Sequence, residues 1–256
     1  MQLIGSNAHQ RKAPFVSGHA MTTVQTQTDR QIMEDSKLKL TFDKYDIELS
    51  NDKAFNLNST DNTFKYDFIY HDKEAPKFQC SQHAIKVSVG GQLYKSAILC
   101  AIAGGTTIHS QSAVIEDNDI FICCADKVFS LSLPDLQLNW MIQADIATCF
   151  GIYQADNGLF THGEMRVTRL DSNGTILWET GLKDIIVYID EEQRYQDAFV
   201  MHDNYIELMD FNGNKYQLGF DGKFISEQLS DQQKRWDIID KKRNQKYEKA
   251  WWKFWV

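Results

Sequence analysis

The pattern of apolar and polar residues divides the chain into three segments. Residues 1–36 are rich in Thr, Gln, Ser and charge, show no sustained periodicity, and are interpreted as a flexible leader. From Leu38 onward, short runs alternate between apolar and polar positions, which is typical of half-buried β-strands. Residues 37–229 are therefore expected to form an all-β domain, and residues 230–256 have a different pattern.

The first half of the β domain predicts two groups of strands. Alternating runs at 38–42, 45–49, 54–57 and 64–70 have the spacing of a four-stranded meander. Further along, Gly90-Gly91 separates two apolar runs. Paired glycines at such a position favour a hairpin, because both residues accept a positive φ. We therefore expect a strand pair around this turn.

The second half contains a sequence repeat. One 39-residue register places equivalent apolar residues at Leu131, Leu170 and Met209. The same offset then places a turn pair after each of them: Pro134-Asp135, Asn173-Gly174 and Asn212-Gly213. Such a period indicates stacked copies of one unit, because a single unit cannot bury its own apolar face. Each unit is expected to be a four-stranded antiparallel sheet.

One copy of the repeat carries a recognisable hairpin. From Val167 to Trp178 the sequence reads VTRLDSNGTILW, in which a strand ending in Leu-Asp leads through a Gly turn to a Trp. This segment resembles the outer hairpin of a blade of the quinoprotein-type, or PQQ-like, β-propellers. Residues 128–140 are a looser copy with Ser132 in place of the Asp, and residues 206–218 lack the Trp.

The resemblance extends over residues 112–220 and implies an architecture. It does not imply quinone chemistry, because the cofactor-dependent members use larger rings and a dedicated pocket that this sequence does not match. No cofactor is expected. At 39 residues a unit, about five units fit between residues 37 and 227. A closed ring, a partial propeller and a plain antiparallel stack all agree with this number.

The C-terminal segment predicts an α-helix with an aromatic end. Ser230 and Gln233 form the pattern of a capping box, so the helix is expected from about Asp231 onward. Its middle turns are polar, and the segment ends in an aromatic cluster formed by Trp251, Trp252, Phe254 and Trp255. The interpretation we favour is that this cluster folds back and caps the β domain.

Two alternatives place the aromatic cluster on another molecule. Trp is common among the residues that dominate protein interfaces, so the cluster is a candidate partner-binding site. Residues 230–256 also carry eight Lys and Arg against four Asp and Glu. Basic and Trp-rich helices bind membrane surfaces, and contact with a membrane surface is the second alternative.

Charge and composition limit the classes of function. The net charge is −8, which argues against sequence-independent binding of nucleic acid, since that requires a cationic surface. A basic protein partner suits this charge better. The chain has no apolar run long enough to span a bilayer and no secretory signal, so a cytoplasmic location is expected. Its five cysteines are expected to be reduced and buried.

The sequence offers one weak candidate for an enzyme site. His162 and Glu164 lie two residues apart on an expected strand, and His202 and Asp203 follow about one repeat later. Equivalent positions of neighbouring blades converge near the axis of a propeller, where these four side chains would bind a divalent metal. Polar residues near hairpin turns explain the same pattern without any function. No catalytic or metal site is therefore assigned.

These observations favour a non-catalytic, intracellular protein-binding module. A more specific hypothesis is an acidic inhibitor or immunity protein that neutralises a bacterial toxin. It rests on the acidic body, the unusual terminal helix and the lack of any common catalytic motif. The alternatives are a metal-dependent hydrolase at the repeat axis and a peripheral membrane-surface protein.

Overall fold

The structure is a computed structural model that describes residues 37–78, 81–155, 158–190, 192 and 194–251, the last eight by their backbone only. Residues 36–256 form a unit separate from residues 1–35. The expected leader lies outside the described residues, so the fold is that of residues 36–256. None of its described helices is long and apolar enough to cross a membrane.

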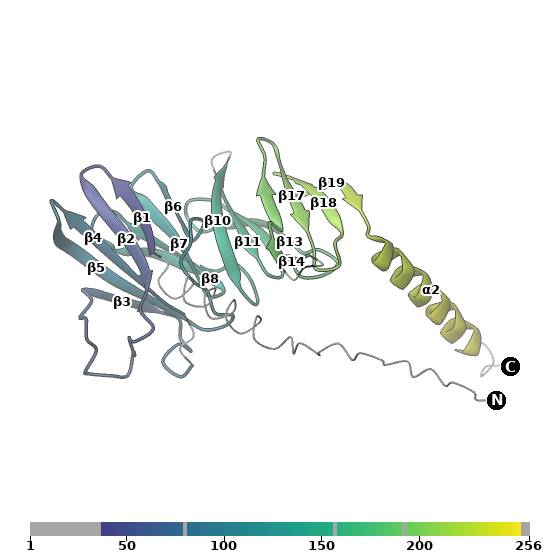
Figure 1. The fold of residues 1–256 in the computed structure, drawn as a ribbon, viewed down its shortest axis with the longest axis horizontal. Coiled ribbons are helices and arrows are strands. Elements are labelled where there is room, and N and C mark those ends of the chain that lie inside the picture. The colour runs from purple at the N-terminus through teal and green to yellow at the C-terminus, as the bar shows by residue number, and fades with distance from the viewer. Residues whose placement is uncertain (1–36, 79–80, 156–157, 191, 193, 252–256) are drawn as a thin grey trace, which may run out of the picture. The chain divides into compact units, whose positions relative to one another are not determined.

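Sheet 1 has five strands in the order β1-β2-β4-β5-β3 (Figure 1). Four of them pair antiparallel, whereas β3 pairs with β5 in parallel. Its strands are β1 (Lys37–Phe42), β2 (Tyr45–Asn51), β3 (Phe68–His71), β4 (Ser81–Val89) and β5 (Gln92–Ala101). The expected hairpin at Gly90-Gly91 is confirmed, with φ of +59° and +76°.

The expected meander is wrong beyond its second strand. Residues 54–57 form turns, and only the end of the run 64–70 joins a strand. The apolar residues of this stretch cover the outer face of sheet 1 instead, where Phe55, Leu57 and Tyr66 pack against Ala84 and Ile98. The apolar residues of this stretch recur because a long loop buries them against the sheet. The sequence pattern alone does not distinguish such a loop from a strand.

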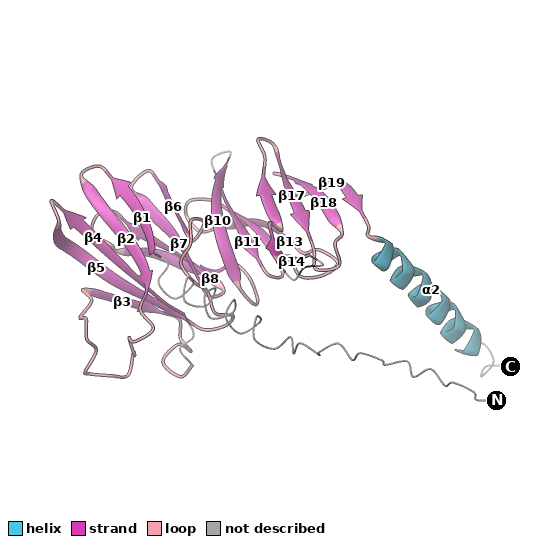
Figure 2. Ribbon diagram, viewed as in Figure 1, coloured by secondary structure: helices cyan, strands magenta, loops and turns pink. Residues whose placement is uncertain are grey.

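Three four-stranded antiparallel sheets follow, and they confirm the expected repeat architecture (Figure 2). Sheet 2 contains β6 (Ala113–Glu116), β7 (Asp119–Cys124), β8 (Lys127–Ser132) and β9 (Leu138–Gln143). Sheet 3 contains β10 (Cys149–Ala155), β11 (Gly158–Gly163), β12 (Val167–Leu170) and β13 (Ile176–Thr180). Sheet 4 contains β16 (Phe199–Met201), β17 (Tyr205–Met209), β18 (Lys215–Gly219) and β19 (Phe224–Gln228). A short pair, β14 (Tyr188–Ile189) and β15 (Tyr195–Gln196), precedes sheet 4.

The third copy of the repeat is displaced from its expected register. Leu131 and Leu170 both lie on the third strand of their sheets, next to a register shift in the pairing with the fourth strand. The equivalent residue in sheet 4 is Leu218, 48 residues after Leu170, whereas Met209 lies on the second strand. The segment that holds β14 and β15 lengthens this repeat. The fourth strand, β19, was therefore not predicted.

The sheets stack face to face through separate apolar cores. On β7, Ile120 and Ile122 pack into the core shared with sheet 1, and Phe121 and Cys123 into the core shared with sheet 3. This division follows from the two-residue period of a strand. A third core joins sheets 3 and 4, with Phe160 among its members. Sheet 2 is thus buried on both faces.

Tryptophans on the fourth strands of sheets 2 and 3 form hydrogen bonds to the next sheet. Trp140 of β9 donates its indole N–H to the carbonyl of Ser172, 3.0 Å away, in the turn between β12 and β13. Trp178 of β13 likewise donates its indole N–H, over 3.0 Å, to the carbonyl of Phe220 in the turn between β18 and β19. At the first interface Tyr70 takes this place and donates its hydroxyl to the Leu136 carbonyl.

The array is open in the described residues. No strand pairing joins sheet 4 back to sheet 1 there, so the fold is a partial propeller of four sheets. The last strand, β19, leads directly into α2 (Asp231–Trp251). The helix begins where the sequence predicts, because the Ser230 hydroxyl accepts the Gln233 backbone N–H at 3.1 Å. The Gln233 side-chain amide donates a hydrogen bond to the Asp237 carboxylate and so does not complete the capping box.

Candidate functional site

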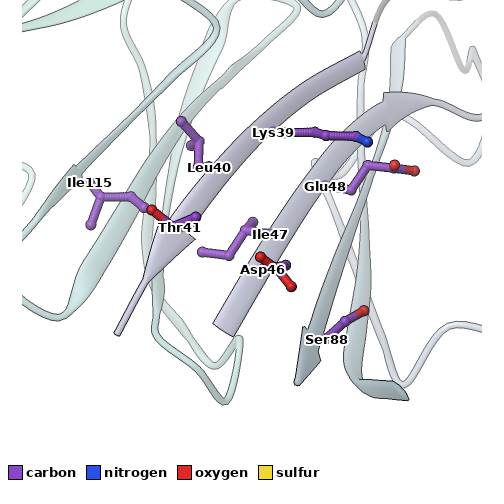
Figure 3. Close-up of a pocket in the computed structure, with 8 residues that line it drawn as sticks. All are labelled: Lys39, Leu40, Thr41, Asp46, Ile47, Glu48, Ser88 and Ile115. Atoms are coloured by element: carbon purple, nitrogen blue, oxygen red, sulfur yellow. The ribbon is translucent and has the colours of Figure 1, made fainter. Parts of the chain in front are cut away.

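A groove of about 880 Å³ lies at the free edge of sheet 1 (Figure 3). Its walls come from the first two strands, with one residue each from β4 and β6. The lining residues are Lys39, Leu40, Thr41, Asp46, Ile47, Glu48, Ser88 and Ile115. Sequence reasoning did not identify this groove.

The sequence of β1 accounts for the groove. Leu38, Leu40 and Phe42 pack against the core between sheets 1 and 2, while Lys39 and Thr41 are exposed. β1 pairs with β2 on one side only, so among the described residues its other edge has no strand beside it. An edge strand of this kind exposes backbone N–H and C=O groups to which another chain can bind.

The groove carries charges of both signs. Lys37 forms an ion pair with Glu48, with 2.9 Å between Nζ and Oε1. Asp46 is exposed and lies opposite Thr41 in the pairing of β1 with β2. The polar lining residues Lys39, Thr41, Asp46, Glu48 and Ser88 offer ion-pairing and hydrogen-bonding groups to a bound chain. The signal in the sequence was the exposed polar alternation of residues 37–42.

A second cavity, of about 490 Å³, lies among loops of sheets 1 and 2. Its buried carboxylates already have partners. Asp72 accepts the backbone N–H groups of Glu74, Ala75 and Ile102. Asp126 accepts from Lys127 and from the Gln143 amide. These acids stabilise the loops, and the cavity offers little unsatisfied polar chemistry to a ligand.

His162 lies between sheets 3 and 4 and makes contacts with both neighbouring segments. Its Nε2 lies 2.8 Å from the carbonyl oxygen of Ile186, and its ring stacks on Phe199 with centroids 5.2 Å apart. Burial lowers the pKa of His162 to about 4, so the ring is neutral at pH 7. Glu164 lies just beyond the strand and accepts a hydrogen bond of 2.9 Å from the Thr148 hydroxyl.

The other candidate residues, His202 and Asp203, lie between β16 and β17 of sheet 4. The His202 ring stacks on Tyr205, and its Nε2 is 3.6 Å from a carboxylate oxygen of Glu207. Asp203 is exposed. No group of three or more His, Cys, Asp or Glu side chains in the described part of the chain is arranged to hold a metal ion. The structure therefore gives the four candidates separate surroundings rather than one site.

Beyond its first turn, the C-terminal helix does not pack on the sheets over its described side chains. Trp236, Ile238 and Ile239 are 55%, 55% and 53% exposed. The expectation that the aromatic cluster folds back and caps the β domain stays a prediction. Trp252, Phe254 and Trp255 lie outside the described residues, and Trp251 is described by its backbone alone.

The sequence matches no family model and no curated protein. Among solved structures, it is similar to the computationally designed Ika8 protein, with 12% identity and a TM-score of 0.39, over 75% of this chain and 49% of that one. It is also similar to BamB from Moraxella catarrhalis, with 12% identity and a TM-score of 0.34, over 59% of this chain and 61% of that one. The chain thus matches about half to three fifths of the length of these structures.

Proposed function

We propose that this chain is a non-catalytic protein-binding module that takes up an extended segment of a partner along β1. The observation that carries this proposal is the groove beside the free edge of sheet 1. A partner strand added at such an edge gains main-chain hydrogen bonds, and side-chain pockets add specificity. The four stacked sheets with their buried cores provide a rigid support for this edge.

In the narrower form of this proposal, the partner is a basic toxin that the chain neutralises in the cytoplasm. The net charge of −8 favours a basic partner. The free thiols of the described cysteines suit a reducing compartment. The Trp contacts between sheets support the resemblance of residues 112–220 to the blades of PQQ-like propellers.

The test uses a charge reversal in the groove, with a matched control elsewhere. The chain with Asp46→Lys, the chain with Asp203→Lys and the unchanged chain serve as baits in extracts of the native host. Both residues are exposed, and the two substitutions change the net charge equally. We expect the unchanged chain and the Asp203 variant to recover one stoichiometric protein that the Asp46 variant recovers at least tenfold less.

Two results would contradict the proposal. Recovery of no stoichiometric partner by the unchanged chain argues against a binding module. Equal recovery by the two variants places the partner away from the groove. The toxin hypothesis has its own readout, because co-expression with the recovered partner should relieve its toxicity to the host.

The exposed helix favours a second candidate function, which is binding through α2. The basic residues of this segment, together with exposed Trp236 and the cluster of Trp251, Trp252, Phe254 and Trp255, suit a partner protein or an anionic membrane surface. Deletion of residues 250–256 is then expected to abolish binding to vesicles containing anionic lipid. If the intact chain does not bind these vesicles, the membrane form of this candidate is wrong.

A further inference from the structure

Two buried thiols face each other across the interface between sheets 2 and 3. The sulfur atoms of Cys123 on β7 and Cys149 on β10 lie 3.1 Å apart. Both residues belong to the apolar core of this interface and are 1% and 0% exposed. They are far apart in sequence, and nothing in the sequence pattern pairs them.

Backbone hydrogen bonds hold the two thiols in register. The N–H of Cys149 donates to the carbonyl of Ala125 at 2.7 Å, which ties the start of β10 to the end of β7. The N–H of Cys123 donates to Ser112 at 2.9 Å, and that of Ile152 donates to Gln111 at 2.8 Å. The contact between the sulfurs is therefore a consequence of how the two sheets join.

Cys124, the next residue on β7, has no facing thiol among the described residues, so the pairing of thiols there is confined to the face of β7 that carries Cys123. Cys124 is just as buried as Cys123, but it belongs to the core on the side of sheet 1. Its sulfur points toward the carbonyl oxygens of Ser81 and Leu99, at 3.9 and 3.7 Å. Cys124 is thus a natural internal control for burial without a facing thiol.

We propose that Cys123 and Cys149 are a redox-sensitive pair: a peroxide oxidises their two thiols to a disulfide. The bond length of a disulfide is about 2.05 Å, so the sulfurs need to approach by about 1 Å. Hydrogen peroxide is small enough to reach the interface when the two sheets open locally. The cross-link would fasten sheet 2 covalently to sheet 3.

The chemistry balances with one peroxide. One cysteine thiol loses its proton and its thiolate attacks a peroxide oxygen. The O–O bond breaks, the leaving hydroxide takes up that proton, and a sulfenic acid and water result. The second thiol sulfur then attacks the sulfenic sulfur, the S–S bond forms, and a second water leaves. Two thiols are oxidised and one peroxide is reduced to two waters. Burial raises the pKa of the Cys123 thiol, so oxidation of the closed fold is slow.

The cross-link is expected to stabilise the fold. It closes a loop between residues 123 and 149 and so restricts the unfolded chain. For a chain of this size, the midpoint of thermal unfolding should rise by roughly 5 to 10 °C. Reducing agents should reverse the change only slowly, because both sulfurs are shielded from solvent.

The test treats the full reduced chain with hydrogen peroxide, unfolds it, alkylates the free thiols and maps the peptides by mass spectrometry. We expect three alkylated cysteines out of five, one peptide pair linked through Cys123 and Cys149, and a mass 2 Da lower before alkylation. The map is read on the unchanged chain, so it does not depend on whether a variant folds. The controls are Cys123→Ala, Cys149→Ala and Cys124→Ala.

Each outcome decides the proposal. The first two variants should lose both the cross-link and the rise in thermal midpoint, and the Cys124 variant should keep both. Five alkylatable thiols after peroxide treatment, or a cross-link that includes Cys124, would overturn the proposal. Sulfinic acid at Cys123 in place of the linked peptides would overturn it too, because the facing thiol would then have failed to react.

Discussion

Three histidines share one arrangement at the scale of single residues. A ring nitrogen of each lies close to a backbone carbonyl oxygen further along the chain: His83 at 3.0 Å from Cys123, His109 at 2.8 Å from Phe150, and His162 at 2.8 Å from Ile186. Such contacts join successive parts of the array. These contacts give the three described rings a structural role at the junctions between sheets.

The burial of His83 predicts a dependence of stability on pH. Burial lowers the pKa of His83 from its usual 6.5 to about 4. The unfolded chain therefore binds more protons between pH 6.5 and pH 4, so this contribution to stability is complete above pH 6.5 and is lost as the pH falls toward 4. Between pH 7 and pH 4.5, the free energy of unfolding should fall by about 2 kcal/mol through His83 alone.

Urea denaturation at the two pH values checks this prediction with a pair of variants. His83→Gln should be less stable at pH 7, but its loss of stability on acidification should be smaller by about 2 kcal/mol. His71 is exposed, and His71→Gln should keep the full loss. Equal losses in the two variants would show that His83 is protonated equally in the folded and unfolded chains.

At the scale of elements, the Trp contacts explain why turn glycines recur. Gly174 has φ of +82°, and a Cβ added there would lie 2.6 Å from the ring of Trp140. Gly222 has φ of +80°, and its added Cβ would lie 2.9 Å from Trp178. The glycine is needed for two reasons, its backbone conformation and the ring that rests on it.

Gly174→Ala is expected to separate these two reasons. It should lower the free energy of unfolding by about 3 kcal/mol, of which about 1 kcal/mol is backbone strain and the rest is the clash with Trp140. Gly91 has a similar φ of +76° with nothing within 4 Å of an added Cβ, so Gly91→Ala should show the strain alone. Chemical denaturation provides both values.

A double variant completes this test. In a Trp140→Ala background, the cost of Gly174→Ala should fall to that of Gly91→Ala, because the ring is gone. An unchanged cost would mean that the turn, rather than the contact between sheets, requires glycine. The sequence predicted the turn and the Trp of residues 167–178, but the partner of Trp178 is 42 residues away and only the stacking of sheets reveals it.

At the scale of the whole molecule, the two ends of the array differ. The outer face of sheet 1 is covered by the loop that contains Phe55 and Tyr66. Sheet 4 ends in the edge strand β19, whose side chains are exposed, and the chain then enters α2. The contacts of the helix with sheet 4 lie at its first turn, through Ser230 to Asn214 and Gln233 to Asn212.

Removal of residues 235–256 is therefore expected to leave the sheets intact. The midpoint of thermal unfolding should change by no more than about 2 °C, because the described side chains from Arg235 to Arg243 are exposed. Truncation before Phe224 is the comparison, since it also removes β19 and should lower the midpoint by much more. A large fall with the first truncation would show that the terminal aromatics pack on the sheets.

The sequence by itself determined part of the local structure of this protein. Alternation in residues 37–49 and 113–170 predicts strands that the structure confirms, because a side chain's face on a strand depends only on its position along it. The cap at Ser230 likewise marks the start of the helix through a bond between near neighbours. Fold class follows from these local features.

Only the tertiary structure decided which residues meet. The open groove beside β1, the contact of Cys123 with Cys149 and the shifted register of sheet 4 all depend on how distant segments are placed. An insertion such as β14 and β15 changes the spacing along the chain without changing the stacking of sheets. The physical reason is that burial between sheets joins segments through space, and a one-dimensional pattern records burial but not the partner that provides it.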